Sequence, residues 1–180
     1  MTKRYQKLFS KLKGKGEGAF IPFCVLGDPN VETSLFLINE MIKAGADALE
    51  LGLPFSDPVA DGPLIQKAGL RALKEGVKIS DCFEIIKRVR QASPEIPIGL
   101  LVYANLIEAR GVETFFEDAG KAGVDSVLIA DAPAHEIDPY LKAARKQGVE
   151  IVLVLPLDAD EKTLEDVASS SEGYLYLLSR

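Results

Sequence analysis

The sequence predicts one α/β domain in which strands and helices alternate and the strands form a parallel sheet. Short apolar segments alternate along the chain with amphipathic segments of helical period. A motif recurs where helices meet strands: Lys-Ala-Gly-Ala-Asp at residues 43–47, Lys-Ala-Gly-Val-Asp at 121–125 and Lys-Gln-Gly-Val-Glu at 146–150. Each copy places Gly at a helix end, just before a buried strand. No linker or low-complexity segment divides residues 1–180, so we expect a single domain with right-handed crossovers.

We expect six strands, at residues 19–25, 46–51, 98–103, 125–130, 150–155 and 174–178. Apolar residues from Tyr5 to Leu12 recur at helical spacing, so an amphipathic helix precedes the strands and its lysines form the solvated face. The glycines at 14, 16 and 18 follow a helix and lead into a strand, which is the wrong order for a phosphate loop. Asn30 and Ser80 are expected to cap helices. Further helices are expected at about 63–75, 112–121, 134–146 and 161–168, with a short turn after residue 103.

The strands favour a (β/α)8 TIM barrel over an open doubly wound sheet. One face of two central strands carries small or functional side chains: Gly99, Leu101 and Tyr103, then Ser126, Leu128 and Ala130. A barrel interior needs such graded packing, and its active site lies at the carboxyl ends of the strands. A complete barrel needs roughly 250 residues. We therefore expect this chain to supply an N-terminal helix and about six βα units of a barrel that is incomplete at its C-terminal end.

Composition describes an ordinary globular protein, with 47% hydrophobic residues and a net charge of −6. That charge argues against nonspecific nucleic-acid binding, which needs clustered positive charge. The basic start of the chain lacks the apolar segment of a signal peptide, and the apolar runs at residues 19–26 and 151–157 are too short to span a membrane. Cys24 and Cys82 have no metal-ligand spacing, so we expect two free thiols in a reduced, cytoplasmic protein.

The strongest chemical signal is an acid inside an apolar strand. Because side chains alternate along a strand, Glu50 shares a face with Ala48 and Gly52, while leucines occupy the other face. Asp61 follows on the turn-rich loop after that strand, so the two carboxylates could converge on a substrate. No lysine lies within an expected strand, and the single histidine, His135, is expected at a surface helix start. Acid–base chemistry by Glu50, Asp61 and Tyr103 is what remains.

Each of these residues also has a purely structural explanation. Glu50 could pair with a buried arginine, but no arginine lies in an expected strand. Asp61 could cap the helix that begins at Pro63. Tyr103 could be a core residue with its hydroxyl satisfied. Asn105 could serve only to build a turn.

The residues also resemble a known family, that of the tryptophan synthase alpha subunit. The resemblance is collinear over residues 5–180 and rests on ALELGLPFSDPVADGP at 48–63, FCVLGDP at 23–29, IGLLVYAN at 98–105, GVDSVLIAD at 123–131 and GYLYLLSR at 173–180. It implies an eight-stranded βα barrel. It also implies a lyase of tryptophan biosynthesis, which cleaves indole-3-glycerol phosphate to indole and glyceraldehyde 3-phosphate by a retro-aldol step.

The resemblance places Glu50 and Asp61 on the family's two catalytic carboxylates. Glu50 would protonate indole C3 and remove the glycerol hydroxyl proton, and ionised Asp61 would hold the indole N–H. The implied substrate-binding residues are Phe23, Leu101, Tyr103, Leu128, Ala130, Val154 and Tyr176. In the family, Leu-Ser-Arg leads into a mobile loop and then into phosphate-binding loops, and none of these follows here.

The resemblance also implies a partner. The family assembles with a pyridoxal-phosphate beta subunit as an alpha2beta2 heterotetramer, and the alpha subunit itself needs neither cofactor nor metal. The implied interface residues are Pro54, Phe55, Ser56, Asp57, Pro58, Tyr103 and Asn105. Two alternatives remain: another phosphosugar barrel enzyme, and a non-catalytic fragment that only binds and activates the beta subunit.

Overall fold

Six parallel strands form one sheet, and each strand pairs with its neighbours in sequence order. The structure is a computed structural model and describes residues 4–178, so residues 179 and 180 of the final motif lie outside it. The strand order is β1-β2-β3-β4-β5-β6. The strands are β1 (Phe23–Val25), β2 (Leu49–Gly52), β3 (Ile98–Val102), β4 (Ser126–Ile129), β5 (Glu150–Leu155) and β6 (Leu175–Leu177). This sequential parallel order is that of a partial (β/α)8 barrel.

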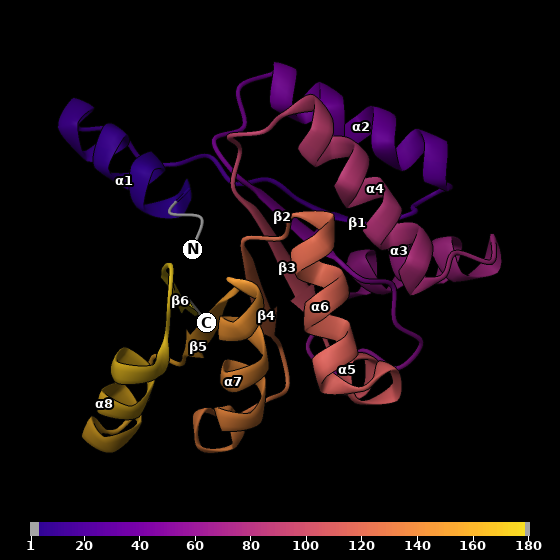
Figure 1. Cartoon of the computed structure of the whole chain (residues 1–180). Coiled ribbons are helices and arrows are strands. Elements are labelled where there is room, and N and C mark those ends of the chain that lie inside the picture. Colours follow the sequence, from indigo (N-terminus) through magenta and orange to yellow (C-terminus); the bar gives the residue numbers. More distant parts are fainter. Residues whose placement is uncertain (1–3, 179–180) are drawn as a thin grey trace.

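Helices connect the strands and cover one side of the sheet, except for α1, which precedes β1. They are α1 (Arg4–Lys15), α2 (Val31–Lys43), α3 (Pro63–Lys74), α4 (Ile79–Ala92), α5 (Ala104–Arg110), α6 (Val112–Ala122), η1 (Ala134–Glu136), α7 (Asp138–Gln147) and α8 (Glu161–Ser170). Figure 1 shows the curved sheet with α2, α4, α6, α7 and α8 arranged along its outer side and α1 set apart from them. Within residues 4–178, none of these helices has the length and apolar character to cross a membrane.

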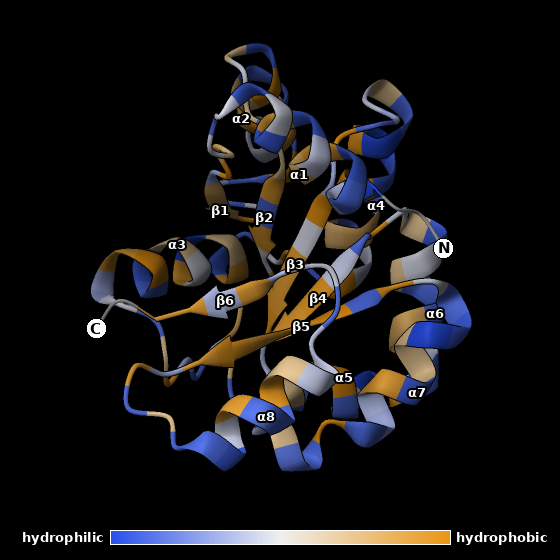
Figure 2. Ribbon diagram, turned by 90° about the vertical axis from the view of Figure 1, so that its left-hand side faces the viewer, coloured by the Kyte–Doolittle hydropathy of each residue, from blue (hydrophilic) through white to orange (hydrophobic). Residues whose placement is uncertain are grey.

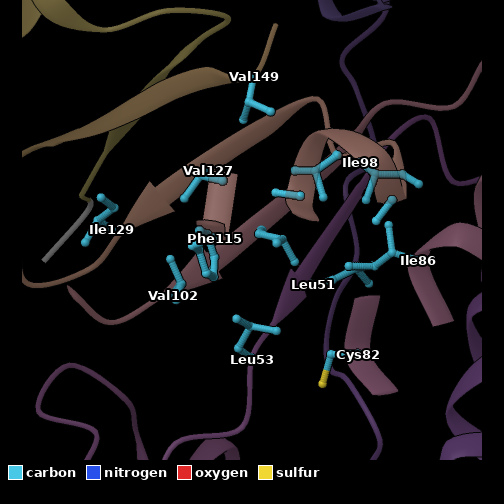
Figure 3. Packing of buried hydrophobic residues seen from close by; sticks show 14 of the residues in the cluster. Leu51, Leu53, Cys82, Ile86, Ile98, Val102, Phe115, Val127, Ile129 and Val149 are labelled. Carbon is cyan, nitrogen blue, oxygen red and sulfur yellow. The ribbon is translucent and has the colours of Figure 1, made fainter. Parts of the chain in front are cut away.

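Alternation along the strands separates two faces. The outward side chains join the helices in one buried core, and they include Leu49, Leu51, Ile98, Leu100, Val127, Ile129, Ile151 and Leu153. In Figure 3, outward residues such as Leu51 and Val127 gather with Ile86 of α4 and Phe115 of α6. Figure 2 shows the strands mostly in apolar colours and many hydrophilic residues on the outer helices. Burial of this apolar stripe on each helix holds the βα units together.

The inward face is organised in register. Phe23 pairs with Glu50, Glu50 with Gly99, Gly99 with Ser126, and Ser126 with Glu150. Residues paired in register point to the same side of a sheet, so these five form one inward row. A second row follows two residues later, from Val25 and Gly52 to Leu101 and Leu128. The expected placement of Glu50 on the face of small residues is therefore confirmed.

The glycines of the repeated motif end their helices as expected. Gly45, Gly123 and Gly148 have φ of 100°, 90° and 70°, a region that favours glycine over residues with a Cβ. The expected cap at Asn30 is also confirmed, because its side chain accepts a hydrogen bond from the Thr33 N–H at 2.9 Å.

Several expected elements were wrong in detail. Residues 104–110 form α5 and not a short turn, a helix too short to show a period in sequence. The helix expected at 134–146 is divided into η1 and α7, because Pro139 suits only a helix start. Ser80 lies inside α4, whose N-cap is Lys78. The first strand is shorter than expected, spanning only Phe23–Val25.

Candidate active site

The carboxyl group of Glu50 lies on the inward face of β2, partly buried. The Tyr174 hydroxyl donates to Glu50 Oε1 at 3.5 Å. Burial raises the pKa of Glu50, and the hydrogen bond from Tyr174 opposes this with a smaller lowering effect. A carboxyl whose pKa is raised toward the working pH can both donate and accept a proton, which is what a general acid–base residue requires.

Two glycines leave room for aromatic rings beside Glu50. A Cβ at Gly99 would lie 2.9 Å from Tyr5 Oη and 3.0 Å from Ser126 Oγ. A Cβ at Gly52 would lie 2.7 Å from Phe23 Cζ. All three distances are shorter than ordinary van der Waals contact. The glycines flanking Glu50 in sequence and register therefore let Tyr5 and Phe23 pack close to it.

Asp61 contributes to a hollow at the carboxyl ends of β1, β2 and β3. The hollow is small, with a cavity volume of about 10 Å³, and is lined by Phe23, Val25, Gly52, Leu53, Pro54, Phe55, Pro58, Asp61, Ile65, Gln66, Gly69 and Leu101. Its wall is mostly apolar, with Asp61 as the one acidic side chain in the lining. An apolar wall with one carboxylate is chemically matched to an apolar ring that carries a single hydrogen-bond donor, but the hollow in this structure has room for little more than one water molecule. Glu50 is not among the lining residues and lies one inward position before Gly52 on β2.

In the structure, the side chain of Asp61 does not cap α3. The N-cap of α3 is Gly62, and no side chain caps this helix. The contact at the helix start involves the Asp61 backbone, whose carbonyl accepts from Gln66 Nε2 at 2.9 Å. The Asp61 carboxylate is thus not used as a helix cap; it borders the hollow and interacts with the Tyr103 hydroxyl.

Tyr103 holds the loop that carries Asp61. Its side chain is only 2% exposed, its hydroxyl accepts from the Ala60 N–H at 3.1 Å, and its ring stacks on Phe55 at 5.0 Å between centroids. Burial raises the pKa of Tyr103, and the charge of nearby Asp61 adds to this, so the hydroxyl keeps its proton. These contacts support the core alternative for Tyr103, with its hydroxyl satisfied by the loop.

The expected substrate-binding residues divide into two groups. Phe23 and Leu101 line the hollow with Asp61, and Leu128 is paired with Leu101 in the same inward row. Tyr176 pairs in register with Val154, and its pKa is raised first by burial and then by the charge of Glu50. Val154 also borders a separate hollow of about 650 Å³, whose lining includes His135, Thr163 and Asp166. Ala130 directly follows β4, where its N–H donates to the Val102 carbonyl at 2.9 Å.

The expected interface residues lie on and beside the loop after β2. Ser56, Asp57 and Asn105 are exposed, whereas Pro54 is buried. The Ser56 hydroxyl donates to the Asp57 carboxylate. Val59 on this loop and Leu64 at the start of α3 are apolar and 82% and 78% exposed, and the sequence did not single them out.

Sequence reasoning also missed Tyr5 and Tyr174, which lie beneath Glu50. The rings of these tyrosines are 5.1 Å apart, and the hydroxyl of Tyr174 reaches Glu50. The spacing of Tyr174 and Tyr176 was a usable signal, because residues two apart on a strand share a face. No local signal pointed to Tyr5, which lies on a helix far from Glu50 in sequence.

The remaining candidate groups show no sign of catalysis. His135 lies on η1 with its Nε2 3.7 Å from a Glu136 carboxylate oxygen, and both side chains are exposed. Burial raises the pKa of Cys24 and of Cys82 to about 12, and both thiols are free. Between residues 4 and 178, no three His, Cys, Asp or Glu side chains are grouped so that they could hold a metal ion.

Comparison with known proteins decides the family. The family model described as "Tryptophan synthase alpha chain" matches residues 9–180. The chain belongs to this family. Among curated family members, the alpha chain of Shewanella oneidensis is 54% identical over 177 residues, which is 98% of this chain and 64% of the relative. The alpha chain of Francisella tularensis is 52% identical over 180 residues, which is 100% of this chain and 67% of the relative.

Solved structures of the family share the fold. A tryptophan synthase alpha subunit from Legionella pneumophila gives a TM-score of 0.94 at 34% identity, covering 98% of this chain and 67% of the other. The tryptophan synthase complex from Pyrococcus furiosus gives a TM-score of 0.84 at 36% identity, covering 89% and 66%. The chain thus spans about two thirds of the length of these family members.

Proposed function

We propose that this chain carries the acid–base residues of a carbon–carbon lyase of tryptophan biosynthesis, which cleaves indole-3-glycerol phosphate to indole and glyceraldehyde 3-phosphate. The observation that carries the proposal is Glu50, a carboxyl of raised pKa on the inward face of β2, in a chain of this family. The apolar hollow bordered by Asp61 supports the choice of an indole ring as the group to be bound.

Glu50 performs both proton transfers in this proposal. Its protonated carboxyl gives a proton to indole C3, which turns the ring into an electron sink. The carboxylate then removes the proton from the hydroxyl on the carbon attached to C3, and the bond between that carbon and C3 breaks. Indole leaves with the electrons of the broken bond and the aldehyde forms, so one residue acts as acid and base in turn.

Asp61 stabilises the charge that develops in this reaction. When C3 is protonated, positive charge grows on the indole nitrogen. An ionised carboxylate at the rim of an apolar hollow is well placed to accept the N–H and to stabilise that charge. No step requires a metal or cofactor, and pyridoxal phosphate is expected in the partner beta subunit.

The rest of the barrel is part of the proposal. The described residues form six strands, and β1 and β6 each pair with a single strand. A closed barrel of this type has eight strands, and family members are longer than this chain. We place residues 1–180 in one barrel domain that is completed by a further C-terminal segment, which would hold the phosphate-binding residues.

A beta subunit is the proposed partner, in an alpha2beta2 heterotetramer. One solved family structure, from Pyrococcus furiosus, is titled as the tryptophan synthase a2b2 complex. On this chain, exposed Ser56, Asp57 and Asn105 with the apolar side chains of Val59 and Leu64 offer a mixed surface typical of interfaces. The cytoplasm is the proposed compartment, in keeping with the two free thiols.

A product assay tests the reaction. The protein, completed by the proposed C-terminal segment, is incubated with indole-3-glycerol phosphate, and indole is measured with and without the beta subunit. Indole release supports the lyase. Turnover of another phosphosugar without indole would favour a different barrel enzyme, and stable binding of the beta subunit without any turnover would favour a non-catalytic role.

A further inference from the structure

The N-terminal helix is tied to the sheet by a shielded ion pair. Arg4 Nη1 lies 2.8 Å from Asp125 Oδ1, and the two side chains are 19% and 0% exposed. Arg4 Nε also donates to the Pro94 carbonyl at 2.8 Å. Asp125 directly precedes β4, and its other oxygen accepts from Arg90 Nη2 at 2.6 Å and from the Ile98 N–H at 2.9 Å. The Asp125 carboxylate therefore joins α1 and α4 to the start of β3.

A second ion pair between α1 and the rest of the molecule, that of Lys7 with Glu95, is much more exposed. Lys7 Nζ lies 3.7 Å from Glu95 Oε2, and the two side chains are 73% and 79% exposed. An exposed ion pair at that distance contributes little to stability, because both side chains are solvated and mobile. Arg4 has two short, charge-assisted hydrogen bonds, a partly buried one to Asp125 and an exposed one to the Pro94 carbonyl, so it fixes the position of the helix start.

Tyr5, the next residue after Arg4, lies beneath the inward row. It is 2% exposed, and it accepts a hydrogen bond from the Ser126 hydroxyl at 3.2 Å. Its ring lies 5.1 Å from that of Tyr174, which in turn donates to Glu50 Oε1. Tyr5 and Tyr174 thus form an aromatic floor on the side of Glu50 that faces α1.

We propose that Arg4 is a positioning residue for Glu50: its ion pair with Asp125 holds Tyr5 against Tyr174 and keeps water from the Glu50 carboxyl. Arg4 itself does not touch the reacting atoms. The proposal deepens the proposed function, because the consequence for turnover depends on Glu50 being the acid–base residue. The change in the pKa of Glu50 does not depend on which reaction the protein catalyses.

The direction of the effect follows from the surroundings of Glu50. The groups around it that titrate are Tyr174 and Tyr176 from β6 and the segment before it, and Tyr5 from α1; the charges behind the floor are Asp125, Arg4 and Arg90. Burial is the largest cause of the raised Glu50 pKa, and the Tyr174 hydrogen bond is the smaller, opposing one. Release of the floor hydrates the carboxyl, so the Glu50 pKa should fall toward its ordinary value.

The test is a titration of Glu50 by ¹³C NMR in protein labelled at the glutamate side-chain carboxyl, with the signal assigned by its loss in Glu50→Gln. Arg4→Met should lower the Glu50 pKa by at least about 0.5, a change within the usual spread for this group. Arg4→Lys, which keeps a charge beside Asp125, should restore most of the parent value. Lys7→Met is the matched control on the same helix and should leave the Glu50 pKa unchanged.

The outcomes separate this proposal from the proposed function. A folded Arg4→Met protein with the parent Glu50 pKa overturns the proposal, as does an equal fall in Lys7→Met. If circular dichroism shows that Arg4→Met does not fold, Arg4→Gln takes its place, since its amide keeps a hydrogen-bond donor. The titration uses no substrate, so a fall in the Glu50 pKa in a protein that releases no indole even when the proposed C-terminal segment is added leaves the positioning role supported and removes the lyase. Where indole release is measurable, the rate is plotted against pH. The acidic side of that profile should shift in the same direction as the Glu50 pKa.

Discussion

At the scale of single residues, Glu50 combines an ionisable carboxyl group with a largely apolar surrounding that disfavours its charge. It lies among Phe23, Gly99 and the tyrosines of the floor, where burial disfavours its charged form. A group with a raised folded-state pKa stabilises the fold fully below its unfolded value, about 4.3 for Glu, and loses that contribution as the pH rises through the folded value. A carboxyl kept at this position despite that cost is typical of a functional group.

Glu50→Gln should therefore separate activity from stability. The substitution keeps the shape but removes the titrating proton, so indole release by the protein completed with the C-terminal segment should fall by at least ~10²-fold. At pH 7 the melting temperature should be equal to or above that of the parent, because a buried ionised carboxylate is replaced by a neutral amide. Kinetics and calorimetry on the same preparation check both parts, and activity within a few-fold of the parent would remove Glu50 from the mechanism.

Asp61→Asn distinguishes a charge at the hollow from a helix cap. Asn caps helices about as well as Asp, and the α3 cap is Gly62 in any case, so the melting temperature should stay unchanged. Turnover should fall by roughly 10-fold or more, because the neutral amide cannot stabilise the positive charge on the indole nitrogen. Parent-like kinetics would show that the carboxylate of Asp61 has no part in the reaction.

At the scale of elements, the unit from β5 to β6 holds an acid without a partner. Glu150 begins β5, and its Oε2 is buried without a hydrogen-bond partner in residues 4–178. A Cβ at Gly173 would lie 2.6 Å from the same oxygen. Burial raises the pKa of Glu150, and the negative charges of Glu172 and Asp125 raise it further.

Glu150→Gln should stabilise the protein at neutral pH. The raised pKa means that the contribution of Glu150 to stability is present at low pH and is lost as the pH rises through the folded-state value. The variant should gain melting temperature over the parent at pH 7 and lose that gain near pH 4. Thermal unfolding across this range measures it, with Glu161→Gln on the exposed start of α8 as control. A variant less stable than the parent at pH 7 would show that the ionised group has a favourable partner.

Gly99→Ala tests the close packing of α1 against β3. The new methyl group would meet Tyr5 Oη at 2.9 Å and Ser126 Oγ at 3.0 Å, so the floor under Glu50 must shift, at a cost of about 1–3 kcal/mol. Gly69→Ala is the matched control: the new Cβ would lie 3.6 Å from the Phe55 carbonyl, and alanine favours a helix interior by roughly 0.5–1 kcal/mol. Denaturant unfolding of both variants should give opposite signs, and equal stability of the two would contradict the packing.

At the scale of the whole molecule, the sequence predicted what depends on regular geometry. The inward place of Glu50 follows from the period of two along a strand, and the helix ends at Gly45, Gly123 and Gly148 follow from the left-handed conformation that glycine favours. The order of strands follows from their alternation with helices. These rules act over short stretches of chain, so a single sequence is enough to apply them.

Features that depend on distant contacts or on short segments were not predictable in this way. Helix α5 is too short to show a period, and Pro139 divides η1 from α7 at a point that a broad apolar pattern hides. The floor of Tyr5 and Tyr174 joins opposite ends of the chain, so only folding brings them to Glu50. The same holds for the Asp61 hollow, whose lining comes from β1, β3 and α3 as well as from its own loop.

The most direct test of the central claim is indole release by residues 1–180, alone and together with the C-terminal segment that is proposed to complete the barrel. The proposed function expects little or no release from the short chain, because two strands and the phosphate anchor that positions the reacting bond are supplied by that segment. Adding the segment should restore release in the parent and fail to do so in Glu50→Gln. Full activity of the short chain alone, or equal release by Glu50→Gln in the completed protein, would contradict the account.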